Sequence, residues 1–186
     1  MQQFGSKFLN RFQASLIDSP VLRGITIIDS PGILNDNTNS EGFDYKAVIR
    51  WFASRADRIF LFVDAHKLEL SGDFQQILNM IRDYDDKLRI VLNKTDLVNE
   101  QELIRLYGAL MWFLGQTLEL TEVAQIYIGS FWGRPVANEA NLRLYEAEEY
   151  RIFEDLAGLQ RESLLRKANY LAKRAAQVAI HACISS

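Results

Sequence analysis

The sequence predicts an α/β fold in which a mostly parallel sheet is flanked by helices and followed by a C-terminal helical segment. Four short apolar runs, each bounded by polar or turn residues, have the length of strands: 24–29, 58–64, 88–93 and 125–129. They lack the polar alternation of half-exposed strands, which is typical of strands buried in a parallel sheet. Helical patterns separate these runs, and this alternation favours a sheet with crossover helices.

Apolar residues recur at helical spacings in three segments between the expected strands. One segment begins at about Asp44, a second follows Gly72, and the third extends over 99–115. Asn99 and Glu102 have the spacing of a capping box at the start of the third helix. From about Asn138 only helical pattern remains, so we expect one domain over residues 1–137 and part of a second, helical domain over 138–186.

Composition and charge exclude several classes of protein. The 186 residues carry a net charge of −3, without the basic excess of a nucleic-acid-binding protein. Cys183 is the single cysteine, so no internal disulfide forms and a reducing compartment such as the cytosol is favoured. No apolar run approaches the ~20 residues of a spanning helix, so any membrane contact is expected to be peripheral.

The first candidate motif is Asp29-Ser30-Pro31-Gly32, which follows the first expected strand. An aspartate at the carboxyl end of a strand can hold a magnesium ion, commonly through water. The Gly32 N–H can donate to a terminal phosphate because no side chain obstructs the approach. Turns contain Asp-x-x-Gly often, so this motif alone carries little weight.

The second motif, Asn93-Lys94-Thr95-Asp96, also follows a strand. Asp96 can accept two hydrogen bonds from guanine, the Lys94 stem can lie along the base, and Asn93 can tie neighbouring loops together. The order of the two motifs, separated by one strand and two helices, is that of P-loop GTPases. Ser130 and Trp132 then follow the last strand, where GTPases place a third base-contacting loop. Trp132 is either a base-stacking residue or a structural aromatic at the domain boundary.

Longer stretches of the chain resemble the EHD family, the C-terminal EH-domain-containing, dynamin-related ATPases. The matching stretches include IIDSPGIL, VLNKTDLV and YGALMWFLG, and the most specific ones are DAHKLELS, YGALMW and YIGSFW. The resemblance implies a dynamin-type G domain that binds ATP with Mg²⁺, forms homodimers or higher oligomers, and hydrolyses ATP slowly. It also implies endocytic recycling and membrane tubulation on endosomal or plasma membranes, with anionic lipid bound through a helical-domain tip beyond this chain.

The resemblance also assigns roles to individual residues. Asp29 and Gly32 match the second switch, with Asp29 as the metal candidate, and Asn93, Lys94 and Asp96 match the base-reading motif. Trp132 matches the tryptophan that lines the base site, and Trp112 matches a tryptophan in the dimer-forming helix. One tension remains, because Asp96 suits guanine better than adenine, whose corresponding edge offers an acceptor and one donor.

The sequence contains no P-loop, since no glycine is followed directly by lysine. We expect the P-loop and the first switch to lie upstream of this chain, and the helical domain to continue downstream. No catalytic residue is assigned, and the chain alone is expected to bind nucleotide poorly and to be inactive. Two alternatives stay open: a non-catalytic dimerising scaffold without nucleotide binding, and a GTP-specific dynamin-like GTPase.

Overall fold

The computed structural model describes residues 4–19, 24–30, 43–68, 70, 72–118 and 125–185. These residues divide into two compact units, Met1–Glu148 and Glu149–Ser186. The predicted boundary between residues 137 and 138 stays a prediction. The helices are α1 (Gly5–Arg11), α2 (Tyr45–Ala53), α3 (Gly72–Ile81), α4 (Glu100–Leu118) and α5 (Leu142–Ser185), with 3₁₀ segments η3 (Arg82–Lys87), η4 (Thr95–Leu97) and η5 (Glu139–Asn141).

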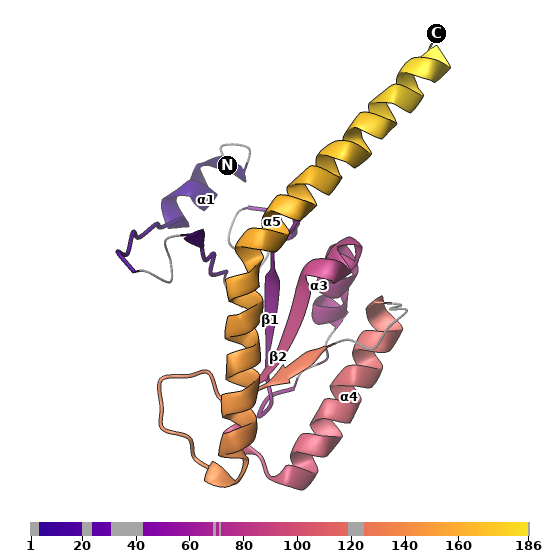
Figure 1. Ribbon diagram of the computed structural model, residues 1–186. Helices are drawn as coiled ribbons and strands as arrows, with labels where there is room; N and C mark the ends of the chain where they lie inside the picture. Colours follow the sequence, from indigo (N-terminus) through magenta and orange to yellow (C-terminus); the bar gives the residue numbers. More distant parts are fainter. Residues whose placement is uncertain are drawn as a thin grey trace. The chain divides into compact units, whose positions relative to one another are not determined.

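The first unit contains a parallel sheet of three strands in the order β1 (Ile59–Asp64), β2 (Leu88–Asn93) and β3 (Ile126–Ile128) (Figure 1). β1 pairs with β2 from Ile59 opposite Leu88 to Asp64 opposite Asn93. β2 pairs with β3 from Ile90 opposite Ile126 to Leu92 opposite Ile128. All three strands therefore end at the same edge of the sheet, as the sequence predicts for a parallel sheet flanked by helices.

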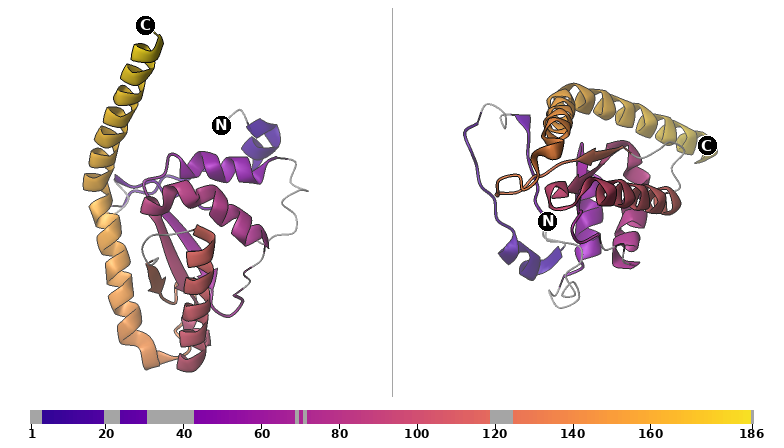
Figure 2. Two further views of the ribbon diagram at one scale, coloured as in Figure 1. Left: turned by 90° about the vertical axis from the view of Figure 1, so that its right-hand side faces the viewer. Right: turned by 90° about the horizontal axis from the view of Figure 1, so that it is seen from below.

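Helices α2, α3 and α4 lie on the same side of this sheet (Figures 1 and 2). One face of the strands and the inner faces of these helices form a single apolar core. Leu78 of α3, Leu92 of β2, and Leu110 and Leu114 of α4 are completely buried in it. The core therefore fixes the helices against the strands whose ends carry the candidate motifs.

The predicted capping box at the start of α4 is confirmed. The Glu102 N–H donates to Asn99 Oδ1 at 2.9 Å, and the Asn99 N–H donates to Glu102 Oε2 at 3.2 Å. The helix expected from about Asp44 is also present, with Asp44 as its N-cap and the Ala47 N–H donating to its carboxylate at 3.0 Å. Both caps satisfy amide groups that have no partner within the helix.

The expected strand over residues 24–29 is wrong. Residues 25–30 belong to neither helix nor strand, and Ile27 and Ile28 are 74% and 49% exposed. A strand needs a hydrogen-bonded neighbour, and in the described part of the chain β1 pairs only with β2. The isoleucine-rich segment therefore has strand-like composition, but no described strand pairs with it.

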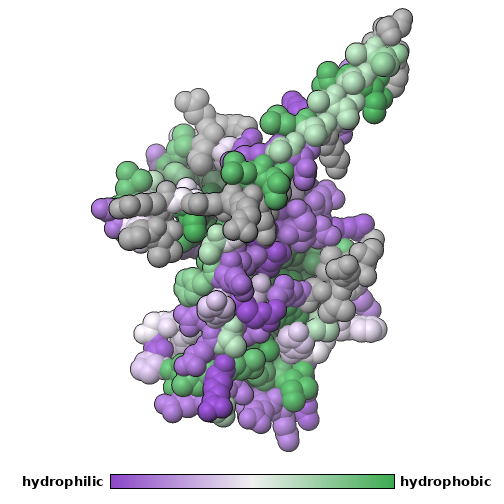
Figure 3. Space-filling view, viewed as in Figure 1, coloured by the Kyte–Doolittle hydropathy of each residue, from purple (hydrophilic) through white to green (hydrophobic). Residues whose placement is uncertain are grey.

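The second unit is the continuation of α5 from Glu149. Several of its large apolar side chains are exposed: Leu164, Leu165, Leu171, Val178 and Ile180. Figure 3 shows hydrophobic surface along this helix. Within the described residues, no helix combines the length and the apolar character that crossing a bilayer requires.

Leu110 offers a test of this core. We expect Leu110→Ala to lower the free energy of unfolding by about 2–5 kcal/mol, because the substitution leaves a cavity in a fully buried position. Ile104→Ala on the same helix is the matched control, since Ile104 is 73% exposed, and its effect should stay within ~0.5 kcal/mol. Urea denaturation measures both. Equal effects of the two substitutions would contradict the packing of α4.

Candidate functional site

Asn93, the last residue of β2, connects the two loops that follow β2 and β3. Its Oδ1 accepts the N–H of Lys94 at 2.9 Å and the N–H of Phe131 at 2.6 Å, while its Nδ2 donates to the Phe131 carbonyl at 3.1 Å. The side-chain amide of Asn93 thus uses both its NH₂ donor and its oxygen acceptor. The expectation that this asparagine ties neighbouring loops together is confirmed.

Lys94 adopts the left-handed conformation, with φ of 58° and ψ of 35°. Non-glycine residues rarely occupy this region, and functional sites are enriched in such strain. The ammonium donates to Asp64 Oδ2 at 2.5 Å, which links the ends of β1 and β2. Because the parallel register places Asp64 directly opposite Asn93, the lysine that follows Asn93 reaches this carboxylate.

The Lys94 ammonium also changes the acidity of Asp64. Burial by itself raises the pKa of Asp64. The hydrogen bonds from Lys94 and from the backbone N–H groups of His66 and Lys67, together with the Lys94 charge, outweigh that effect and lower the pKa below its ordinary value. The carboxylate is therefore ionised at neutral pH and holds the lysine in place.

Asp96 lies inside the protein at the start of the same loop, with 3% of its surface exposed. Its Oδ1 accepts the Ser130 hydroxyl at 2.6 Å, and its Oδ2 accepts the Ala137 N–H at 3.0 Å. Trp132 Nε1 in turn donates to Ser130 Oγ at 2.9 Å. This chain of hydrogen bonds fixes the orientation of the Trp132 indole from the interior.

The Trp132 ring is half-buried and faces two cations. The Lys94 ammonium lies 5.8 Å from the ring centroid, and the Arg134 guanidinium lies 5.2 Å from it. A positively charged group near an aromatic face is attracted by the ring quadrupole. An aromatic plane next to a lysine stem and two positive charges suits a flat, electron-rich base attached to phosphates.

The structure brings together Asn93, Lys94, Asp96, Ser130 and Trp132, all predicted from the sequence. Asp29 is different, because it is exposed and does not follow a strand of the sheet. Gly32 lies outside the described residues.

The described residues do not build a metal cage by themselves, since no group of three or more His, Cys, Asp or Glu side chains forms among them. A magnesium ion bound with a nucleotide needs only one or two carboxylates plus phosphate oxygens. Asp29 fits that limited role chemically.

Trp112 lies on α4, away from the network around Asn93, and is 70% exposed. Its neighbour Phe113 stacks on Phe74 of α3, with ring centroids 5.8 Å apart and an interplanar angle of 17°. Only one of these two flanking aromatics therefore faces solvent within the described structure. A Cβ added at Gly108 or Gly115 would meet no described atom within 4 Å, so the helix surface near Trp112 is open.

Sequence reasoning missed Asp64, Phe131 and Ala137 as parts of this site. Asp64 carried a recognisable signal, since it is a charged residue at the end of a buried strand next to β2. Phe131 and Ala137 contribute backbone groups, which have no signature in side-chain identity.

The Asp64–Lys94 pair predicts a pH dependence. A carboxyl whose pKa is lower in the folded state stabilises the fold above its unfolded pKa, about 3.9, and this contribution is lost as the pH falls through the folded pKa. We expect Asp64→Asn to lose less stability than the unmodified chain between about pH 5 and pH 3, as followed by urea midpoints. Asp83→Asn, at an exposed carboxylate, should keep the unmodified profile. Parallel profiles for all three proteins would contradict the pair.

Comparisons with known proteins show to which family the sequence is similar. The sequence profile of the Dynamin family matches residues 1–95. EH domain-containing protein 2 of Homo sapiens is 49% identical and EH domain-containing protein 1 of Bos taurus is 47% identical, each over 188 aligned residues. Both matches cover 100% of this chain but 35% of the relative, so the chain spans about a third of the length of these proteins. The chain therefore belongs to the dynamin family, as a relative of the EH domain-containing proteins.

Proposed function

We propose that this chain is part of the ATP-binding domain of an EHD-type membrane-remodelling ATPase that acts in endocytic recycling and membrane tubulation. The observation that carries the proposal is the convergence of Asn93, Lys94 and Trp132 at the carboxyl ends of parallel strands. Ligands of open α/β sheets bind at this edge.

In this proposal, the base lies between the Lys94 stem and the Trp132 ring. The Asp64 carboxylate holds the lysine, and the Ser130 hydroxyl holds the indole, so both groups are oriented before a ligand arrives. Such preorganisation favours binding because fewer side chains must be immobilised. The phosphates extend toward a P-loop that this sequence does not contain.

The environment of Asp96 supports adenine over guanine as the base. A guanine-reading aspartate must turn both oxygens toward the ligand. Here both oxygens accept hydrogen bonds from Ser130 and Ala137, and the residue is buried. Each oxygen keeps a further lone pair, but the 3% exposure of Asp96 limits the access of a guanine to it, whereas adenine needs no pair of acceptors at this position. Asp96 acts in this proposal as a structural residue of the base site.

A magnesium ion would accompany the ATP phosphates, with Asp29 as a carboxylate near it and the Gly32 N–H near the terminal phosphate.

One observation favours a second candidate, a dimerising scaffold without nucleotide binding: the sequence contains no Gly-Lys pair to hold phosphates. The two functions differ in whether an N-terminal extension that carries a P-loop restores ATP binding.

The test uses the chain extended at its N-terminus by the P-loop segment of EH domain-containing protein 2. We expect this protein to bind ATP with Mg²⁺ more tightly than GTP in calorimetric titrations. Trp132→Ala should weaken ATP binding by about 1–3 kcal/mol, because base–aromatic stacking is lost. Lys94→Ala should also weaken binding.

Trp112→Ala is the matched control, since it removes an exposed tryptophan that lies on α4. It should leave the affinity for ATP unchanged. A folded extended chain that binds no ATP would favour the scaffold, and preference for GTP would favour the dynamin-like GTPase.

We further propose that α4 forms the contact between two copies of the protein, with Trp112 as its anchor. The exposed indole lies beside Gly108 and Gly115, where the helix surface is open to a neighbouring molecule. Tryptophan is enriched among residues that dominate binding energy. The contact would pair the same helix from two copies about a two-fold axis, and membrane binding through anionic lipid would belong to other parts of the assembly.

We expect Trp112→Glu to convert dimers of the chain into monomers, because a buried charge replaces an anchor whose removal costs about 2 kcal/mol or more. Multi-angle light scattering measures the mass, and circular dichroism checks the fold. Asn79→Glu, which adds the same charge at an exposed position on α3, should leave the dimer intact. A Trp112→Glu protein that remains dimeric would place the interface elsewhere.

A further inference from the structure

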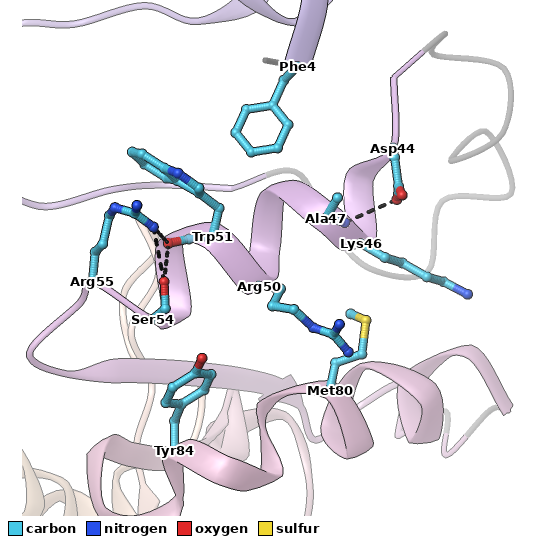
Figure 4. Close-up of a pocket in the computed structure, with 10 residues that line it drawn as sticks. All are labelled: Phe4, Asp44, Lys46, Ala47, Arg50, Trp51, Ser54, Arg55, Met80 and Tyr84. Carbon is cyan, nitrogen blue, oxygen red and sulfur yellow. Dashed lines mark hydrogen bonds between the residues drawn. The ribbon is translucent and has the colours of Figure 1, made fainter. Parts of the chain in front are cut away.

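A groove of about 610 Å³ runs along α2 in the first unit, away from the strand ends (Figure 4). Phe4 borders it on one side, and Met80 of α3 and Tyr84 of η3 border it on the other. None of the described residues that line the groove belongs to the candidate nucleotide site, so the groove is a separate site. Its volume falls within the ~300–1,000 Å³ that ligand sites commonly have.

Positive charge dominates the lining of this groove. Among the described residues that line it, three are cationic, Lys46, Arg50 and Arg55, and one is anionic, Asp44. The Asp44 carboxylate already accepts the Ala47 N–H as the N-cap of α2. The three cations and the one carboxylate of the described lining leave a net charge of +2, which attracts anionic ligands.

Each cation keeps donors available for a ligand. Within the described part of the chain, the Lys46 ammonium bonds to the neutral Gln76 side chain. Arg55 lies 3.9 Å above the Trp51 ring and donates from Nη1 to the Trp51 carbonyl and to Ser54 Oγ, which leaves its other N–H groups. Among the described residues, no side chain pairs with the Arg50 guanidinium, which points toward Met80 in Figure 4.

Aromatic and thioether surfaces alternate with these charges. Phe4 meets the Trp51 ring edge to face at 6.0 Å, and the Tyr84 ring and Met80 face the groove from the opposite side. Trp51, Met80 and Tyr84 are each half-buried, so each keeps apolar surface that a ligand can cover. The groove therefore suits a ligand with apolar groups between its negative charges.

The spacing of the cations indicates the shape of that ligand. Lys46 and Arg50 are one helical turn apart, which is about 6 Å along the axis of α2. Arg55 follows beyond the end of the helix, at the far end of the groove (Figure 4). A single phosphate cannot span three cations arranged in a row. In an extended peptide, alternate side chains lie on the same side and about 6.5 Å apart, which is close to the separation of Lys46 and Arg50 along the helix axis.

We propose that this groove binds an acidic peptide segment in extended conformation, with carboxylates at alternate positions and apolar side chains between them. The carboxylates pair with Lys46, Arg50 and Arg55 in turn. The intervening side chains cover Trp51, Met80 and Tyr84. Arg50 is the central contact because its guanidinium can bind a carboxylate through two hydrogen bonds.

The test measures binding of a fluorescein-labelled, amidated peptide Glu-Phe-Glu-Phe-Glu to the chain by fluorescence anisotropy. We expect saturable binding that weakens as the salt concentration rises, because surface ion pairs are screened. Arg50→Gln should weaken binding about tenfold, as loss of a hydrogen bond between charged groups predicts. Arg105→Gln, an exposed arginine of α4, is the matched control and should leave binding unchanged. Circular dichroism verifies that both variants fold.

Three results would overturn the proposal. Equal binding by Arg50→Gln and the unmodified chain would remove the groove from the interaction. Equal binding of the uncharged peptide Gln-Phe-Gln-Phe-Gln would show that carboxylates are not recognised. Displacement of the acidic peptide by inorganic phosphate at equal concentration would reassign the groove to a small anion.

Discussion

The parallel register of β1, β2 and β3 is the constraint on which the candidate site depends. It places Asp64 opposite Asn93 and directs the loop after β3 toward the loop after β2, where the Gly129 N–H donates to the Leu92 carbonyl at 3.0 Å. A shift by one residue would move every side chain of a strand to the other face of the sheet. Core packing and site geometry therefore depend on the same pairing. Ile90 and Leu92 of β2 pack in the core, and Asn93 of the same strand belongs to the site.

The sequence predicted those parts of the fold whose stabilising partners are local or repeated. Asn99 and Glu102 form their capping box within one helical turn, so four consecutive residues contain all the required information. The strand over 88–93 has the predicted bounds because it is buried on both faces. The segment 24–29 has a similar apolar content, three residues of six against four of six in 88–93. A strand also needs a neighbour, and composition does not reveal whether one is present. For this reason the same reasoning succeeded at β2 and failed at residues 24–29.

In the candidate site, the residue types were predictable but the direction of Asp96 was not. A sequence motif shows which side chains follow a strand, whereas the orientation of these side chains depends on loops that are distant in sequence. The Ala137 N–H that binds Asp96 lies 41 positions further along the chain, and a backbone amide is present at nearly every residue. No side-chain pattern could have identified it. The path of the chain after β3 therefore determines which internal hydrogen bonds Asp96 makes.

Trp112 and Phe113 show how adjacent aromatics acquire different roles. Successive residues of a helix differ by about 100° in direction, so a helix that buries one face presents neighbouring positions to different surroundings. Phe113 falls close enough to the buried stripe to stack on Phe74, and this contact joins α3 to α4. Trp112 is rotated past the edge of that stripe, beyond the reach of α3. Its exposure is thus a geometric consequence of seating Phe113 in the core, and the packing of the described unit gives no reason for a large aromatic there.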